Sequence, residues 1–179
     1  MRSLIDLVVK LLSNPVVTFG LMAVMSFFAL FIALFSEAFL GLEPCILCVA
    51  QRYPFAIGIA LAFMGLGVRK DSFLSGALFI FSGLGFLINS GLAFYQTGIQ
   101  LRWWVSGIEA CSVTFMEDAT PQNILQNLMS SPMSSCDEIT WADPIFGLTI
   151  ANYNIAFSFG MFIFCLLAAW FVNKNKPTN

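Results

Sequence analysis

Long stretches without a charged residue dominate this chain and restrict its fold more than any other feature. The run Val16–Phe35 contains no charge, and neither do Phe73–Tyr95 and Ile145–Val172. About 20 consecutive apolar residues in a helix cross the hydrocarbon core of a bilayer. Each run is therefore long enough to form a transmembrane helix.

The composition also indicates a membrane protein. Of the 179 residues, 59% are hydrophobic and 10% are charged, whereas a soluble domain carries about 25% charged residues. We expect one integral membrane domain over residues 1–179. There is no basic stripe to indicate a nucleic-acid partner. The chain has no His, which removes the centre of zinc-hydrolase and Ser-His-Asp mechanisms.

The sequence predicts an all-α integral membrane protein, a four-transmembrane-helix bundle with two outer loops that carry cysteines. The expected helices cover about residues 16–35, 49–68, 73–95 and 150–172, and the outer loops cover about 36–48 and 96–149. In the second loop, 121–129 is expected to form a short amphipathic helix on the membrane surface. A signal peptide is the alternative for the first run, but its apolar region would be only about 7–15 residues long.

Basic residues set the expected orientation. Six of them fall at the N-terminus, the turn between the second and third helices, and the C-terminus: Arg2, Lys10, Arg69, Lys70, Lys174 and Lys176. These three places share one side of a four-helix topology, and the positive-inside rule makes that side cytoplasmic. Both cysteine-bearing loops are then expected to face outward.

Cys45 and Cys48 lie three residues apart at the edge of the second span. Two thiols at this spacing close a small disulfide that is readily exchanged. Pro44 is favoured at the first position of a helix, where free N–H groups and the helix dipole stabilise a thiolate. Arg52 follows Cys48 by one helical turn and adds a positive charge. The alternative for Arg52 is an anchor at the membrane interface.

The outer loops hold four of the five cysteines. Cys45 and Cys48 can close locally, which leaves Cys111 and Cys136 as the simplest second pair. Two alternatives remain open. One is a zinc site, although only one cysteine pair has ligand-like spacing. The other is a pair of inert structural disulfides, although the short loop between Cys45 and Cys48 would constrain the unfolded chain little. Cys165 lies deep in the last apolar run and is expected to act as a small hydrophobe.

These features together resemble the disulfide bond formation protein B family (DsbB). The resemblance rests on Pro44–Cys48 followed by Arg52, on the distant cysteine pair in the second outer loop, and on the four helices. The end of the second loop is also similar, with Cys136-Asp-Glu, then Trp141, then Gly147–Asn154 entering the last helix. The match covers nearly the whole chain.

The resemblance implies a function in the bacterial inner membrane. A periplasmic DsbA-like thiol oxidase would attack the Cys111–Cys136 disulfide, with Cys111 forming the mixed disulfide. Electrons would pass by thiol exchange to Cys45–Cys48 and then to a membrane quinone, either ubiquinone or menaquinone. Cys48 would lie nearer the quinone ring, and Arg52 would hold a quinone oxygen.

One feature departs from the family pattern. Some members carry a histidine linked to the quinone site, and this chain has none, so water, quinone or an acid must carry protons. We assign no such role to Gln96, Gln100 or Glu109. Two alternatives remain: the DsbI branch, which serves a dedicated oxidase, and a non-enzymatic, tetraspanin-like scaffold with a disulfide-braced loop. The scaffold class would carry Cys-Cys-Gly and a larger outer domain.

Overall fold

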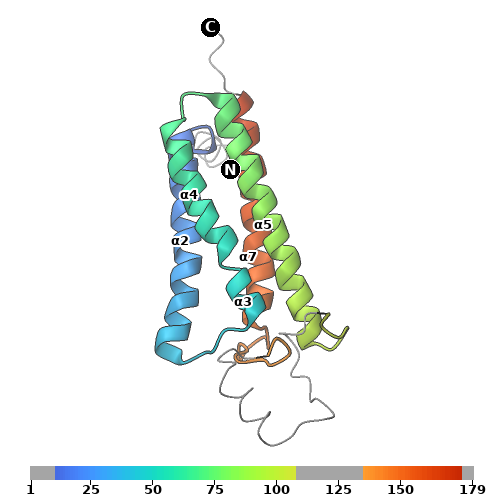
Figure 1. Cartoon of the computed structure of the whole chain (residues 1–179). Coiled ribbons are helices and arrows are strands. Elements are labelled where there is room, and N and C mark those ends of the chain that lie inside the picture. The colour runs from blue at the N-terminus through green and yellow to red at the C-terminus, as the bar shows by residue number, and fades with distance from the viewer. Residues whose placement is uncertain (1–10, 108–134, 175–179) are drawn as a thin grey trace, which may run out of the picture.

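The described part of the protein is a bundle of long helices (Figure 1). The computed structural model describes residues 11–107 and 135–174. Its helices are α2 (Pro15–Leu40), α3 (Ile46–Ala50), α4 (Tyr53–Gly67), α5 (Ser72–Gln100) and α7 (Ile150–Lys174). Four segments of this part are long and apolar enough to cross a membrane, with α3 and α4 together forming one of them. The predicted all-α, four-helix membrane bundle is confirmed.

Local sequence signals set where the helices begin and end. Asn14 caps α2, because its side chain accepts the N–H of Val16 at 3.0 Å. Gly41 ends α2 with a φ of +64°, a left-handed conformation that glycine adopts without a Cβ penalty. Asp71 caps α5 by accepting two N–H groups of its first turn. This cap keeps the turn between α4 and α5 short.

Pro54 divides the second span into two helices. Proline has no N–H to donate to the carbonyl of Ala50, and α3 ends at Ala50. The chain tightens there, since the N–H of Arg52 donates to the carbonyl of Val49 at 3.1 Å. α4 then resumes at Tyr53. The span is therefore broken before Pro54, and Arg52 lies within the break.

Small residues bring the helices together in two pairs, α5 with α7 and α2 with α4 (Figure 1). A Cβ added at Gly83 of α5 would lie 3.2 Å from the Cβ of Cys165 on α7. In the core, the rings of Phe19 and Phe79 stack with centroids 4.0 Å apart. Close backbone approach of this kind drives helix association in lipid. Gly83 is therefore a packing residue between α5 and α7.

The third helix is longer than its apolar run. α5 has 29 residues, which at about 1.5 Å per residue is about 43 Å, against about 30 Å of hydrocarbon core. Its last turns carry Gln96 and Gln100, which the sequence pattern placed in a loop. The expected surface helix 121–129 lies outside the described residues.

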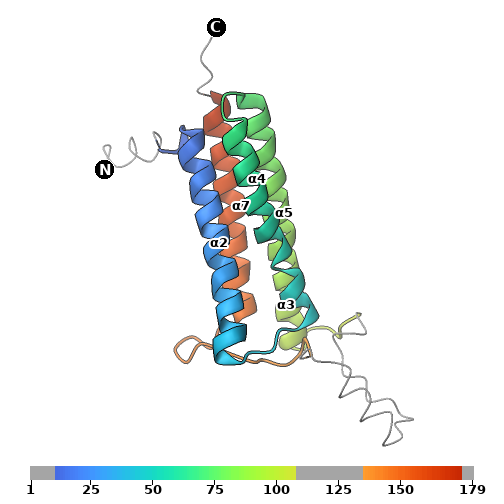
Figure 2. The ribbon, with the colours of Figure 1, turned by 60° about the vertical axis from the view of Figure 1, so that its left-hand side comes forward.

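The two ends of the bundle differ in the segments they carry. α2 begins, α4 turns into α5 and α7 ends at one end of the bundle, whereas α3, the end of α5 and residues 135–149 lie together at the other (Figures 1 and 2). Segments that are far apart in the sequence therefore meet beside α3, where Cys45 and Cys48 lie.

Candidate active site

The two cysteines of the Cys-x-x-Cys motif lie at the start of α3. Cys45 is the N-cap of this helix, and its Sγ accepts the N–H of Cys48 at 3.3 Å. The Sγ atoms of Cys45 and Cys48 are 2.7 Å apart. The structure holds both as free thiols, so a disulfide between them needs little movement. Pro44 precedes the cap rather than occupying the first helical position that we predicted.

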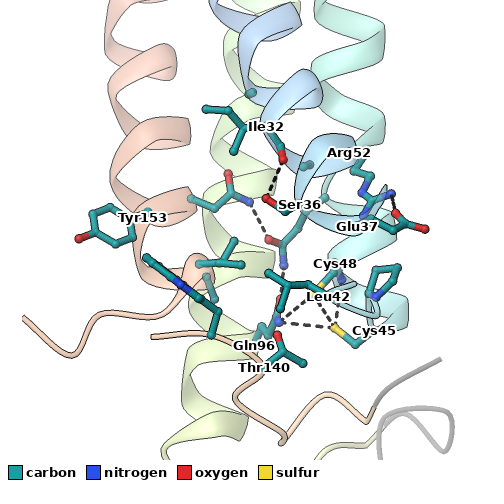
Figure 3. Close-up of a pocket in the computed structure, with 18 of the residues that line it drawn as sticks. Ile32, Ser36, Glu37, Leu42, Cys45, Cys48, Arg52, Gln96, Thr140 and Tyr153 are labelled. Atoms are coloured by element: carbon teal, nitrogen blue, oxygen red, sulfur yellow. Dashed lines mark hydrogen bonds and ion pairs between the residues drawn. The ribbon is translucent and has the colours of Figure 1, made fainter. Parts of the chain in front are cut away.

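Gln96 joins this pair from α5. Its Nε2 donates to the Sγ of Cys48 at 3.1 Å and lies 3.5 Å from the Sγ of Cys45 (Figure 3). The side chain of Gln96 is buried. The sequence analysis gave Gln96 no role, and the available signal was an amide within the last turns of an otherwise apolar helix. A buried amide in a spanning helix needs a polar partner, and here the sulfurs provide it.

The sulfurs share their protons unequally. The hydrogen bond with Cys48, together with burial, raises the pKa of Cys45 above the ordinary value of a thiol. Cys45 is therefore the harder of the two thiols to deprotonate. Cys48 also accepts from Gln96, so the negative charge of a singly deprotonated pair is best placed on Cys48.

Arg52 lies beside the pair and forms an ion pair with α2. Its Nη1 donates to Oε2 of Glu37 at 2.6 Å (Figure 3). Arg52 also lines the same cavity as Cys48. Sequence reasoning did not single out Glu37, because no local motif links residues 15 positions apart.

A cavity of about 620 Å³ opens next to the sulfurs. Its polar wall includes Cys48, Gln51, Arg52, Gln96 and Asn154. Its apolar wall includes Phe28 and Ile32 of α2, Phe55 of α4, and Ile150 and Phe157 of α7. Pockets for small molecules commonly have volumes of about 300–1,000 Å³ and this mixture of apolar walls and few polar groups.

Cys136 packs against the same end of the bundle. It is fully buried in a cluster with Cys45, Leu47 and Ile99. Cys136 is disulfide-bonded. Cys111, its predicted partner, lies outside the described residues, so that pairing stays a prediction. Within 11–107 and 135–174, no group of three His, Cys, Asp or Glu side chains could hold a metal ion.

Comparison with known proteins identifies the family. The model of the disulfide bond formation protein DsbB matches residues 15–168. The chain belongs to the DsbB family. The resemblance drawn from the Cys-x-x-Cys motif, the arginine and the four helices is thereby confirmed. DsbB proteins are membrane proteins of disulfide bond formation, and we assign this chain a thiol oxidoreductase activity on that basis.

Curated relatives cover most of the DsbB-family chain at low identity. A disulfide bond formation protein B of Psychrobacter is 28% identical over 79% of this chain and 82% of its own. One from Xylella fastidiosa is 26% identical over 81% of this chain and 84% of its own. An uncharacterized Rickettsia prowazekii protein is 27% identical over 84% and 86%. No solved structure matches the chain.

Proposed function

We propose that this DsbB-family protein reoxidises a periplasmic, DsbA-like thiol oxidase and delivers the electrons to a membrane quinone. Cys111 and Cys136 form the disulfide that the partner attacks, and Cys45 and Cys48 form the second disulfide. The observation that carries this proposal is the position of Cys48, whose sulfur is 2.7 Å from that of Cys45 and also lines a cavity beside Arg52.

Thiol–disulfide exchange accounts for the first two steps. Each step breaks one disulfide and forms another, through attack of a thiolate on a sulfur. In the first step, the partner's two thiols become a disulfide and the Cys111–Cys136 disulfide is reduced. In the second step, the thiols of Cys111 and Cys136 reduce the Cys45–Cys48 disulfide and become a disulfide again. Burial of Cys136 in one cluster with Cys45 supports direct exchange between the two pairs.

The residues around the cavity suit a quinone. A flat, mostly apolar ring with two carbonyl oxygens fits a space with aromatic and aliphatic walls and a few hydrogen-bond donors, and the donors here include Arg52, Gln51 and Asn154. When bound, a quinone supplies an acceptor for two electrons and two protons, which returns the Cys45–Cys48 pair to a disulfide.

Three side chains have separate roles in this proposal. Cys48 presents the electron-rich sulfur to the cavity. Arg52 donates to a quinone oxygen and stabilises the negative charge that develops there. Glu37 holds the guanidinium of Arg52 at the cavity wall through their ion pair. Because Glu37 is the acid nearest Arg52 in the described part, it can also replace the missing histidine as a proton carrier.

The orientation belongs to this proposal too. Arg69 and Lys70 lie in the α4–α5 turn, and Lys174 ends α7, all at the end of the bundle away from the cysteines. By the positive-inside rule that end faces the cytoplasm. The cysteine end then faces the periplasm of a bacterial inner membrane, where a thiol oxidase can reach it.

A reconstituted assay tests the function. Purified protein in detergent is mixed with a reduced DsbA-like oxidase and a short-chain quinone, and quinone absorbance is followed under anaerobic conditions. We expect quinone reduction that requires both proteins. Oxidation of the partner without loss of quinone absorbance would contradict the quinone step, and the absence of both reactions would contradict the function as a whole.

The orientation has its own test. A membrane-impermeant maleimide added to intact spheroplasts should label reduced Cys111 from outside. Labelling of Cys111 only in inverted vesicles would reverse the proposed topology.

A further inference from the structure

A row of buried amides leads from the sulfur of Cys48 into the bundle (Figure 3). Gln96 Nε2 donates to Cys48 Sγ at 3.1 Å, and Gln96 Oε1 accepts from Gln51 Nε2 at 2.7 Å. Gln51 Oε1 in turn accepts from Asn154 Nδ2 at 2.6 Å. The row therefore connects α5, the α3–α4 break and α7 to one sulfur.

The row continues deeper into the bundle. Asn154 Oδ1 accepts from Ser158 Oγ at 2.9 Å, and Ser158 Oγ accepts from Asn89 Nδ2, also at 2.9 Å. We call these five residues, Asn89, Ser158, Asn154, Gln51 and Gln96, the amide chain. Asn89 and Ser158 are fully buried and do not line the cavity.

All five hydrogen bonds of the row point the same way. Each member donates to the next, and the last donor, Gln96, makes its shorter hydrogen bond, 3.1 Å, to the sulfur of Cys48 and a longer one, 3.5 Å, to that of Cys45. Hydrogen bonds aligned in this way polarise one another, and a low-dielectric interior strengthens each of them. The positive end of the row faces Cys48, so the arrangement favours an electron-rich, hydrogen-bond-accepting sulfur.

We infer that the amide chain is a positioning device for the redox pair, which holds Cys48 as the hydrogen-bond acceptor and favours negative charge on its sulfur. The inference rests on the proposed function and deepens it, because it names the groups that prepare Cys48 for electron transfer into the cavity. Gln96 acts on the sulfur directly. Ser158 and Asn89 act through the other members.

A purely structural role is the competing explanation. Buried amides also hold transmembrane helices together, and the amide chain joins α5 to α7. The two roles predict different results for the chemistry of Cys48. A structural contact changes the stability of the bundle, whereas a charge-stabilising contact changes how the reactivity of Cys48 depends on pH.

The test measures alkylation of Cys48 by iodoacetamide in the reduced, quinone-free protein between pH 5 and 10, with the site identified by peptide mass spectrometry. Other titratable groups around the pair remain in every variant: Glu37, Glu43, Cys45, Arg52, Tyr95, Glu138 and Tyr153. One variant is Gln96→Met, which keeps the side-chain volume and removes the donor. The other is Ser158→Ala, which interrupts the row at a residue that does not line the cavity.

Ser82→Ala is the matched control. Ser82 is buried on α5 like Gln96, but its hydroxyl donates to the carbonyl of Leu78 in its own helix at 2.8 Å. We expect Gln96→Met to slow alkylation of Cys48 at pH 7 about tenfold, since a hydrogen bond to a charged group is lost, and to move the pH profile upward. Ser158→Ala should produce a smaller change in the same direction, and Ser82→Ala should leave the profile unchanged.

Two results would overturn the inference. One is a Gln96→Met profile that coincides with that of the parent protein. The other is a Ser82→Ala shift as large as the Ser158→Ala shift, which would assign both to packing. If Gln96→Met does not fold, the comparison of the Ser158→Ala and Ser82→Ala pH profiles still tests the inference. Because no quinone is present in this test, failure of the proposed function appears separately, as absence of turnover in the parent protein.

Discussion

Cys48 and Cys165 are both free thiols in apolar helices, yet their surroundings differ completely. Cys165 is fully buried on α7, where its thiol lies 3.8 Å from the sulfur of Met22 and its Cβ lies against Gly83. Cys48 accepts a hydrogen bond from an amide, its sulfur lies 2.7 Å from that of a second thiol, and it lines a cavity. Its neighbours stabilise charge, whereas those of Cys165 only exclude water.

This difference shows what makes a membrane thiol reactive. Both thiols lie in helices of apolar spans, Cys48 near the start of one and Cys165 in the interior of another. The distinction comes from polar groups that three other segments bring to Cys48: Gln96 from α5, Gln51 from the α3–α4 break, and Asn154 from α7. Reactivity is thus a property of the assembled bundle end.

Replacing each thiol by serine should separate the two sites most strongly. Cys48→Ser should lower quinone-dependent turnover at least about a thousandfold, because removal of a nucleophile abolishes the route it serves. Cys165→Ser should leave turnover within about twofold, since surface and packing changes away from a site leave its chemistry intact. Normal turnover by the Cys48→Ser protein would contradict the claim that Cys48, unlike Cys165, is a reactive thiol.

Alkylation of the reduced protein should show the same contrast without any substrate. At pH 7 we expect Cys48 to react about a hundredfold faster than Cys165, because a thiolate is the reacting species and burial among apolar groups suppresses it. The raised pKa of Cys45 keeps that thiol protonated at neutral pH, so the first adduct should form on Cys48. Peptide mass spectrometry measures all three rates, and equal rates for Cys48 and Cys165 would contradict the account.

Substitution of Arg52 tests whether the cavity beside Cys48 binds quinone. Arg52→Ala should raise the KM for quinone about tenfold, because a charged hydrogen bond is worth about 1.5–3 kcal/mol. Thiol exchange with the partner should keep its rate, which quenched-flow alkylation measures. The KM of Arg52→Lys for quinone should lie between those of the parent protein and Arg52→Ala, because lysine keeps the charge but lacks the planar guanidinium group. An unchanged KM in Arg52→Ala would make Arg52 an interfacial anchor.

Around Cys165 the expected effects concern stability alone. Gly83→Val places a side chain against the Cβ of Cys165, 3.2 Å from the first added carbon, and should destabilise the bundle by about 1–3 kcal/mol. Gly85→Val is the matched control, because nothing lies within 4 Å of a Cβ there. Thermal unfolding in detergent compares the two. Equal unfolding temperatures would show that α5 and α7 do not pack as closely as the structure indicates.

The fold could be predicted from the sequence because each span carries its own signal. Length and absence of charge identify a transmembrane helix without reference to any other part of the chain. Asn14, Gly41 and Pro54 likewise act on their own neighbours in sequence, where they start, end and interrupt helices. These signals are local, and the membrane removes most competing structures.

The candidate site was predictable only where its residues are close in sequence. Cys45, Cys48 and Arg52 lie within one short motif. Gln96 and Glu37 reach the site from other helices, and their sequence surroundings carry no motif. Arg52 also pairs with Glu37 of α2. Contacts between helices depend on packing, which periodicity does not encode.

A single-turnover experiment tests the central proposal most directly, that electrons leave through Cys45 and Cys48. Fully reduced protein is mixed anaerobically with one equivalent of quinone, and absorbance measures the loss of quinone. Alkylation then stops the reaction, and mass spectrometry identifies which cysteines have become a disulfide. With Cys111→Ser and Cys136→Ser present, we expect one Cys45–Cys48 disulfide per quinone reduced and a reduced Cys165. Quinone reduction that leaves Cys45 and Cys48 as thiols, or a quinone that stays oxidised, would contradict the account.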